Sequence, residues 1–421
     1  MVFPIQVECD GVEKITRPLD TLIIGGGPAG ATAAILLAKA GWSIGLVEKK
    51  NFPRLKVCGE FMSATNLDLI QQLGLSEFFF AASGPEIKRV GLFAADAVLV
   101  TQMPTEQNTS QKWGRALGRD HLDFALLNRA KQLGIALWQP CNILEIKQVQ
   151  GMYLCKLVHN GEMQEISARF LIMACGSWEG NISHFNALPH KPSDLLAFKA
   201  HFRNTELDPD LMPLIAFPGG YGGLVHSDQG RVSLSFCMRR DVLQQVRKLY
   251  PGRLAGEAAL CYIKEHCFGV QKVLKNSLRE GNWLACGPIR PGVRQRYHNG
   301  IFYIGNIAGE AHPIVAEGIS MAMQSAWLLS HILLGRSRKL MTESDLNDVG
   351  KEYSKQWYTH FAARIHAATL FSQIAMRPWS RAVMIQLVKC FPGILTYGAK
   401  LSGKIKQVVY TEMTHIIDKD N

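Results

Sequence analysis

The sequence predicts an α/β protein in which a Rossmann-like domain with a parallel sheet is joined to an antiparallel-sheet domain and a helical C-terminal segment. Three observations predict this fold class. A strand, a glycine-rich loop and a helix follow one another from residue 22, and residues 232–236 alternate as in a half-buried antiparallel strand. The chain also has 421 residues, 47% apolar and 19% charged, which is enough for two or three domains with buried cores.

The first element is the glycine-rich loop with its flanks. Residues 22–24 form an apolar run typical of a buried parallel strand, and residues 25–30 match the pattern G-x-G-x-x-G. Strong helix formers fill residues 31–40, a second strand is expected at 43–47, and Glu48 stands at its end. In such a unit the glycines let the backbone turn and approach a pyrophosphate, while the acid accepts hydrogen bonds from ribose hydroxyls. The sequence therefore predicts a dinucleotide site, without distinguishing NAD from FAD.

A second unit begins near residue 301. Residues 301–304 predict a buried strand, residues 305–309 a glycine turn, and residues 320–334 an apolar helix preceded by the loop 313–319. A polar residue at the strand tip suits the ribityl chain of a flavin. The N–H groups of a helix N-terminus suit the flavin pyrimidine edge, where negative charge collects on reduction. Taken alone, the same pattern also fits an ordinary β-α unit.

Together, the two units resemble the FAD-dependent oxidoreductases related to para-hydroxybenzoate hydroxylase, and their geranylgeranyl reductase branch in particular. Three further segments carry the resemblance: a Pro-Arg…Cys-Gly loop at 52–60, an Arg-Asp element at 114–120 that opens a helix, and a glycine-tyrosine turn at 217–223. The similarity spans about residues 20–335 and implies FAD as the cofactor.

Two positions depart from that family. Asn306 stands where the family has a strand-tip acid, so hydroxyl binding is kept but one negative charge is lost. Residues 174–178 read Ala-Cys-Gly-Ser-Trp where the hydroxylases have Ala-Asp-Gly, which disfavours an aromatic hydroxylase.

The resemblance also implies a domain division and a set of cofactor contacts. We expect a discontinuous FAD-binding domain (1–85, 115–185 and 285–335), a substrate domain (86–114 and 186–284) and a basic helical region (336–421). The expected cofactor-binding residues are Gly25, Gly27, Pro28, Ala29, Gly30, Glu48, Lys49, Arg54, Cys58, Gly59, Arg119, Asn306, Gly309, Pro313, Gly318 and Ile319. No second complete G-x-G-x-x-G is present, so the reductant is expected to be either transiently bound NAD(P)H or an external reductase.

Four side chains expected beside the flavin ring are candidate catalytic residues. Cys58 would shape the pocket or move a proton, and His312 would polarise the substrate. Glu60 and Glu317 would each donate a proton on the side opposite hydride delivery. Each also has a structural interpretation: a buried thiol, a loop histidine with satisfied partners, or helix-capping carboxylates.

The substrate is expected to contact the central segment, about residues 190–285. Its candidate pocket wall comprises Phe198, Phe202, Phe217, Tyr221 and Phe236, with core packing between sheet and helices as the alternative for each ring. No convergent polar groups are evident in this segment, which favours a small lipophilic substrate.

Charge is concentrated near the C-terminus. The net charge is +11, and residues 353–410 hold eight Lys and Arg residues with no Asp or Glu, so the rest of the chain carries only +3. Interleaved Trp, Tyr and Phe favour peripheral contact with an anionic membrane, and a helical cap over the two domains is the alternative. Nucleic acid is not expected as a partner because no reading module is present. The sequence does not indicate an oligomeric state.

Motifs that the sequence lacks bear on metal binding and on cellular location. The ten cysteines contain no C-x-x-C pair, so no metal site is expected. The N-terminus has no secretory pattern and no apolar stretch reaches ~18 residues, so we expect a cytoplasmic protein, peripheral at the inner membrane face.

These observations predict an FAD-dependent oxidoreductase acting on a lipophilic substrate. The resemblance implies an isoprenoid- or polyketide-like chain in which reduced flavin reduces a carbon–carbon double bond. A flavin-dependent monooxygenase that hydroxylates an aromatic or lipophilic substrate is the alternative on the same scaffold. A halogenase is disfavoured because no W-x-W-x-I-P segment occurs. A flavin-loaded binding or RNA-modifying factor is the remaining interpretation of the charge.

Overall fold

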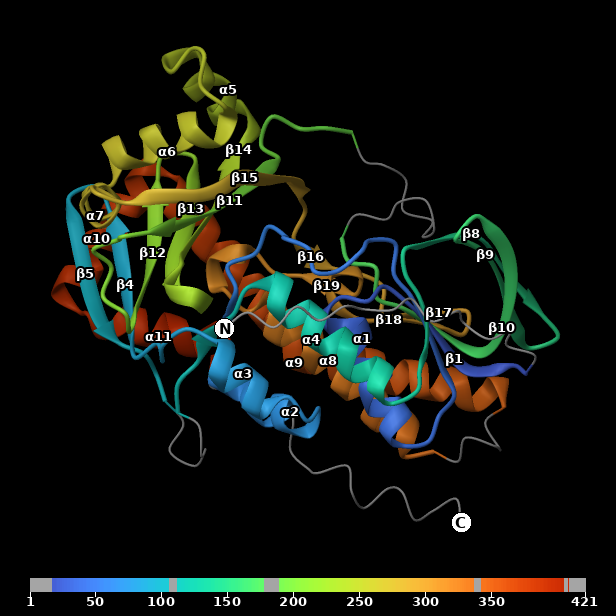
Figure 1. Cartoon of the computed structure of the whole chain (residues 1–421). Helices are drawn as coiled ribbons and strands as arrows, with labels where there is room; N and C mark the ends of the chain where they lie inside the picture. The colour runs from blue at the N-terminus through green and yellow to red at the C-terminus, as the bar shows by residue number, and fades with distance from the viewer. Residues whose placement is uncertain (1–16, 106–111, 178–188, 337–341, 405–407, 409–421) are drawn as a thin grey trace.

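The computed structural model describes residues 17–105, 112–177, 189–336, 342–404 and 408. Within these residues, two large β-sheets are built from segments that alternate along the chain, and each sheet carries its own helices (Figure 1). One sheet is mainly parallel, the other mainly antiparallel, and three helices follow at the C-terminal end. The predicted fold class is therefore confirmed.

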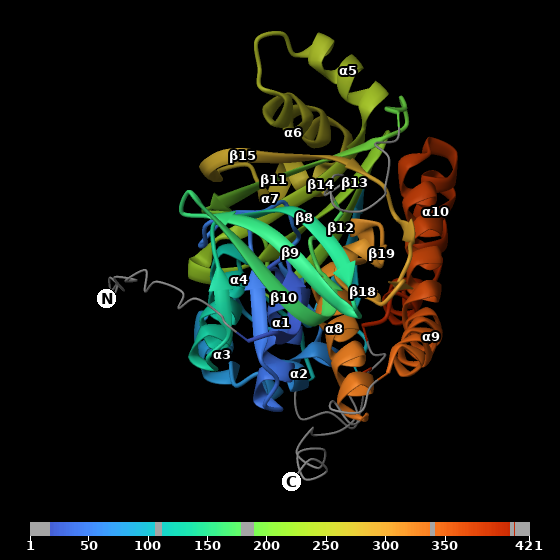
Figure 2. The same cartoon turned by 90° about the vertical axis from the view of Figure 1, so that its right-hand side faces the viewer.

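The first sheet has a parallel centre in the order β18-β10-β1-β2-β7. Strands β8, β9 and β17 extend this sheet through antiparallel pairing. The strands of the sheet are β1 (Leu19–Ile24), β2 (Ile44–Val47), β7 (Ala136–Trp138), β8 (Cys141–Val149), β9 (Met152–His159), β10 (Glu162–Met173), β17 (Tyr297–His298) and β18 (Ile301–Tyr303). β2 and the last three residues of β1, 22–24, are apolar and buried, as expected for the centre of a parallel sheet. Helix α1 (Pro28–Lys39) packs between α4 (Arg119–Gln132) and α8 (Gly318–Leu334) (Figure 2).

The second sheet has the order β15-β11-β14-β13-β12-β4-β5. Its strands are β4 (Arg89–Ala94), β5 (Ala97–Gln102), β11 (Leu195–Arg203), β12 (Leu211–Phe217), β13 (Gly220–His226), β14 (Val232–Arg239) and β15 (Leu278–Ile289). Neighbouring strands are antiparallel except β4 and β12, which run parallel. Helices α5 (Arg240–Leu249), α6 (Ala255–His266) and α7 (Phe268–Val273) cover one face (Figure 1).

Strand alternation places four expected pocket residues on the helix-covered face of this sheet. The rings of Phe198, Phe202, Phe217 and Phe236 are buried in one cluster with side chains of α5, α6 and α7. Core packing therefore accounts for Phe202 and Phe217, which line neither cavity of the site, whereas Phe198 and Phe236 also border an apolar cavity described below. Successive side chains of a strand point to opposite faces, so the residues between these rings face the first domain instead. Tyr221 lies in a different cluster, on that other face.

The domain boundaries follow from strand pairing. β4 and β5 belong to the second sheet although the chain returns afterwards to the first domain, where β3 (Phe61–Met62) pairs with β6 (Arg115–Ala116). β15 continues to Ile289 in its ladder with β11, so the second sheet ends a few residues later than expected. Short helices α2 (Leu67–Gln72) and α3 (Ser76–Ala82) precede β4, and β16 (Gly292–Val293) pairs with β19 (Gly309–Glu310) after β15.

The C-terminal helices are α9 (Glu343–Met376), α10 (Pro378–Cys390) and α11 (Gly393–Leu401). Trp357 and Phe361 of α9 are buried in the core of the first domain, whereas Ile385 and Val388 of α10 join a cluster on the second sheet. The C-terminal helices thus pack on both domains. Among the described residues, no single helix combines the length and apolarity needed to cross a bilayer; α10 and α11 meet that test only as a pair, bent by 115°.

Candidate functional site

A groove of about 850 Å³ lies where the carboxyl ends of β1 and β2 meet the second domain. Its walls come from the glycine loop, the segment after β2, the loop 54–61, the end of β10 and the segment 305–319. Most of the residues expected to bind the cofactor line it: Gly25, Gly27, Pro28, Ala29, Glu48, Lys49, Arg54, Cys58, Gly59, Arg119, Asn306, Pro313, Gly318 and Ile319.

The three motif glycines have different structural roles. Gly25 has a φ of +110°, and a Cβ there would lie 2.5 Å from the carbonyl oxygen of Ala174. A Cβ on Gly30 would lie 1.8 Å from the carbonyl oxygen of Gly25, so packing of loop against helix requires this glycine, which does not line the groove. A Cβ on Gly27 would meet no protein atom closer than Arg119 Nη2 at 4.0 Å. Gly27 therefore leaves open the space through which a pyrophosphate can approach the backbone.

Glu48 is held by the backbone while it faces the groove. Its Oε2 accepts a hydrogen bond from the Gly26 N–H at 2.8 Å, and its Oε1 accepts one from the Lys50 N–H at 2.9 Å. Because a carboxylate oxygen has two lone pairs, each oxygen retains one for a ribose hydroxyl. The structure thus orients this acid as a dinucleotide requires.

Three cations line the middle of the groove. Arg119 is buried and donates two hydrogen bonds to Asp123, at 2.6 and 2.7 Å, while Arg54 stacks on the ring of Phe52. The Lys56 amine lies nearby, and burial together with the charge of Arg119 lowers its pKa. Such a concentration of positive charge beside Gly27 fits the pyrophosphate of FAD.

The far end of the groove is formed by the segment before α8. Asn306 donates hydrogen bonds from Nδ2 to Ser177 Oγ and to Glu310 Oε1, both at 3.2 Å, and its side chain borders the groove. α8 begins at Gly318, where a Cβ would meet nothing within 4 Å, so the helix N-terminus opens onto the groove. Gly309 does not line the groove; a Cβ there would lie 2.3 Å from Trp357, which makes it a packing residue. These residues fit a flavin dinucleotide along its whole length.

Glu60 lines the groove, where its carboxylate is held in a buried ion pair. Its carboxylate binds the Lys199 ammonium and lies 3.0 Å from His201 Nε2, both on β11. Burial alone would raise the pKa of Glu60, but Lys199 and His201 outweigh burial and lower this pKa to about 2. A carboxyl group with that pKa is ionised at neutral pH, so the expected proton donation by Glu60 disagrees with the structure.

Glu317 is also buried, and it does not line the groove. Its Oε1 accepts a hydrogen bond from Lys404 Nζ at 3.0 Å, and its Oε2 accepts one from Ser63 Oγ at 3.1 Å. Lys404 also donates to the carbonyl oxygen of Val315 at 2.9 Å. The carboxylate therefore ties α8 to the C-terminal segment, and its expected role as a proton donor disagrees with this placement.

His312 and Tyr221 form a buried pair between the two domains. His312 lines the groove, and its Nδ1 lies 3.0 Å from the Tyr221 hydroxyl. Burial lowers the pKa of His312 to about 4 and raises the pKa of Tyr221 well above its ordinary value. At neutral pH the pair is therefore an uncharged imidazole next to an uncharged phenol.

A second, smaller cavity of about 80 Å³ adjoins the groove, and Tyr221 lines it. The two cavities share seven lining residues, Val57, Cys58, Gly59, Ser235, Ile289, Pro313 and Ala316. The rest of its lining is predominantly apolar and comes from the face of the second sheet toward the first domain, including Ala197, Met212 and Leu214. Phe198 and Phe236 border it as well. Cys58 thus stands at the junction of a dinucleotide-sized groove and an apolar pocket.

Sequence reasoning missed Lys56, Lys199, His201 and Cys286. Lys199 and His201 had a signal, because they alternate with Phe198 and Phe202 along one strand and so had to face the other domain. Lys56 and Cys286 line the groove, but nothing in their local sequence distinguishes them from other loop and strand residues.

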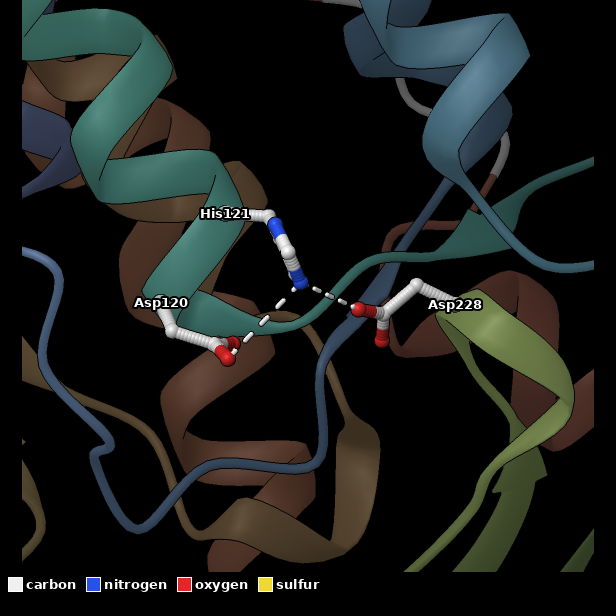
Figure 3. Close-up of side chains that lie close together, drawn as sticks. All are labelled: Asp120, His121 and Asp228. Atoms are coloured by element: carbon white, nitrogen blue, oxygen red, sulfur yellow. Dashed lines mark ion pairs between the residues drawn. The ribbon is translucent and has the colours of Figure 1, made fainter. Parts of the chain in front are cut away.

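A group that could hold a metal ion, by its geometry, lies apart from the groove (Figure 3). His121 on α4 places Nε2 2.9 Å from Asp228 Oδ2 and 3.8 Å from Asp120 Oδ2. However, Arg231 Nη2 donates to Asp228 Oδ2 at 2.6 Å and already neutralises that carboxylate. We interpret the cluster as a tie between α4 and the second domain.

This tie should make stability depend on pH. The hydrogen bond to Asp228 raises the pKa of His121, so the stabilisation is complete below about pH 6.5 and is lost as pH rises through the folded pKa. We expect the melting temperature of the wild type to fall as pH rises through the folded pKa of His121. In the His121→Ala variant this fall in melting temperature should be absent. An unchanged profile in the variant would show that His121 is not the titrating group.

Comparison with known proteins supports FAD as the dinucleotide that the groove binds. Residues 18–182 match the family model described as FAD binding domain. Conditioned medium factor receptor 1 of Dictyostelium discoideum is 23% identical over 81% of this chain and 68% of its own length. Digeranylgeranylglycerophospholipid reductase 2 of Methanothermobacter thermautotrophicus is 24% identical over 74% of this chain and 77% of its own. Squalene monooxygenase 1,2 of Brassica napus is 20% identical over 91% of this chain and 74% of its own.

Similarity at the level of fold extends over nearly the whole chain. The crystal structure of a geranylgeranyl bacteriochlorophyll reductase-like protein from Thermoplasma acidophilum has a TM-score of 0.70 at 19% identity and covers 95% of each chain. The family match covers the glycine loop, Glu48 and Arg119, the residues whose geometry fits a dinucleotide. Residues 18–182 therefore carry an FAD binding domain, and the chain as a whole has the fold of the geranylgeranyl bacteriochlorophyll reductase-like protein.

Proposed function

We propose that this protein is an FAD-dependent oxidoreductase that reduces a carbon–carbon double bond of a lipophilic, isoprenoid-like substrate. The observation that carries the proposal is the apolar cavity next to the groove, with the neutral Tyr221–His312 pair at their boundary. A pocket with few polar groups selects an apolar chain, because polar substrates would lose hydrogen bonds on entry. The similarity to a digeranylgeranylglycerophospholipid reductase supports the same substrate class.

The residues divide the work of the reaction between binding and proton supply. Gly27, Arg119 and Glu48 would hold and orient the dinucleotide, and FAD would supply the hydride chemistry when bound. Tyr221 supplies the proton that the second alkene carbon must receive. Its hydroxyl is protonated at neutral pH, and His312, as the tautomer with the proton on Nδ1, would donate to the Tyr221 oxygen at 3.0 Å, which leaves the Tyr221 O–H for the substrate. Solvent would replace the proton, and the two electrons would come from an external two-electron reductant such as NAD(P)H.

Product analysis tests this proposal against monooxygenation. The FAD-loaded protein, chemically reduced, would be incubated with digeranylgeranylglycerophospholipid without oxygen, and with squalene in air. A product that has gained two hydrogen atoms under anaerobic conditions supports reduction. A product that has gained one oxygen atom, formed only in air, would overturn reduction in favour of the alternative that the squalene monooxygenase similarity represents.

Tyr221→Phe isolates the proton supply. We expect turnover of the alkene to fall about 10²-fold, because the variant lacks the proton at the cavity while the ring keeps its packing. FAD binding and its chemical reduction should be unchanged, since Tyr221 does not line the groove. Tyr262→Phe is the matched control, because that half-buried tyrosine lies on α6 and lines neither cavity. Equal turnover by the two variants would exclude Tyr221 as the proton source.

A further inference from the structure

The outer side of α10 and α11 is apolar and exposed. Residues 379, 383 and 387 are spaced four apart, so they lie on one side of α10. The exposed large side chains along the two helices are Trp379, Val383, Leu387, Phe391, Ile394, Tyr397 and Leu401, each between 41% and 69% exposed. We call these seven residues the apolar face. Such a run of large exposed apolar side chains on a folded protein marks a contact surface.

The apolar face is not required for packing of the core. The opposite sides of the same helices carry Ile385 and Val388 on α10 and Ala399 on α11, which are buried against the second sheet. The helices are thus attached through one side, and α10 forms the outer edge of the molecule at the right of Figure 2.

Positive charge flanks the apolar face without opposition. Arg377, Lys389 and Lys400 are exposed on or beside these helices, and no Asp or Glu occurs between residues 353 and 410. Arg364 and Lys404, by contrast, are buried: Arg364 Nη1 donates to Gln324 Oε1 at 3.1 Å, and Lys404 pairs with Glu317. The cations available to a partner are therefore found mainly at α10 and α11, a narrower region than the whole basic segment.

The shape of the helix pair favours a surface that lies along a bilayer. α10 and α11 together are long and apolar enough to cross a membrane, but they are bent by 115° and anchored on the second sheet. Short amphipathic helices with Trp and Phe on one side and Lys or Arg beside them bury their apolar side at the level of the lipid headgroups. A second copy of this chain would instead bring like charges together.

We propose that the apolar face and its flanking cations dock onto a bilayer that contains anionic phospholipid. The apolar side chains supply the insertion and the cations supply attraction to the headgroups, so binding needs both. This proposal rests on α10 and α11 alone and does not depend on the reaction proposed above.

Vesicle binding by the FAD-loaded full chain tests the proposal. Vesicles of phosphatidylcholine alone and of phosphatidylcholine with phosphatidylglycerol would be sedimented with the protein. We expect stronger binding to the anionic vesicles, weakened by salt, and at least about tenfold weaker binding for the double variant Trp379→Ser, Phe391→Ser. Lys389→Gln should weaken binding about fivefold, the effect of one charge near an anionic surface. Phe268→Ser is the matched control, because that phenylalanine is 49% exposed but belongs to α7 and is not part of the apolar face.

A label reports whether the apolar face itself enters the lipid. Cys390 is exposed, whereas the other cysteines of the described ranges are buried or half-buried, so an environment-sensitive fluorophore can be attached there in a Cys9→Ser background. A blue shift on adding anionic vesicles supports the proposal. Equal sedimentation of the double variant and of Phe268→Ser, or no binding by the wild type, would overturn it. The proposal would also be overturned if the wild type were a dimer that binds no vesicles and the double variant were a monomer. The apolar face would then be a contact between subunits.

Discussion

Gly30→Ala is expected to give a chain that loses both its stability and its FAD. The new Cβ would lie 1.8 Å from the carbonyl oxygen of Gly25, and that atom belongs to a backbone turn that cannot move without breaking the contact with β10. We expect a destabilisation of about 4 kcal/mol or more, at the upper end for single substitutions. Urea unfolding and the flavin absorbance of the purified protein measure the two effects.

Gly27→Ala separates cofactor binding from folding at the same loop. Its Cβ would meet no protein atom closer than 4.0 Å, so the unfolding free energy should stay near that of the wild type. The methyl group would occupy space needed by the pyrophosphate, and FAD affinity should fall by about 10²-fold or more. Gly335→Ala, which adds only ordinary contacts at 3.5 Å and beyond, is the control. Full FAD binding by Gly27→Ala would mean that the pyrophosphate lies elsewhere.

Lys199→Met should have the second large effect. It removes the main partner of Glu60 and leaves this buried carboxylate without its direct ion pair to an ammonium group. Breaking a buried pair from one side typically costs about 3–5 kcal/mol, because an uncompensated charge stays in a poorly solvating environment. The double variant Glu60→Gln, Lys199→Met should recover much of that loss, since the charge is then absent. Chemical unfolding of the four members of the cycle measures the coupling.

The same ion pair predicts an acid limit to stability. The pKa of Glu60 is lowered to about 2, so its stabilising contribution is complete above the ordinary value of about 4.5 and disappears as pH falls through the folded value. The wild type should therefore lose stability between these values faster than the double variant. If the wild type and the double variant lost stability identically in acid, the Glu60–Lys199 pair would contribute little to the free energy of unfolding. Additive effects of the two single substitutions at neutral pH would lead to the same conclusion.

The parts of the fold that sequence predicts best are those whose signals are local. The glycine loop, the strand before it and Glu48 lie within thirty residues, and the backbone geometry that they require leaves few alternatives. The aromatic residues of β11 and β14 were harder to place, because alternation defines two faces without saying which one meets the helices. The contacts of Glu317 could not be predicted for a different reason. Its partner Lys404 is distant in sequence, and only the packed C-terminal segment brings the two together.

The chain leaves the first domain to form β4 and β5 of the second sheet and then returns to the first domain. This path limits how the two domains can be separated and in which order they can fold. β4 lies between β5 and β12 in the second sheet, and Arg89 takes Leu211 as its register partner. During synthesis, β4 therefore emerges long before the strand that covers its open edge, and the nascent chain presents unpaired backbone groups until then. No single cut of the gene releases either domain as one continuous polypeptide. The two fragments made by a single backbone cleavage between β5 and β6 should accordingly remain associated on a sizing column and separate only in denaturant.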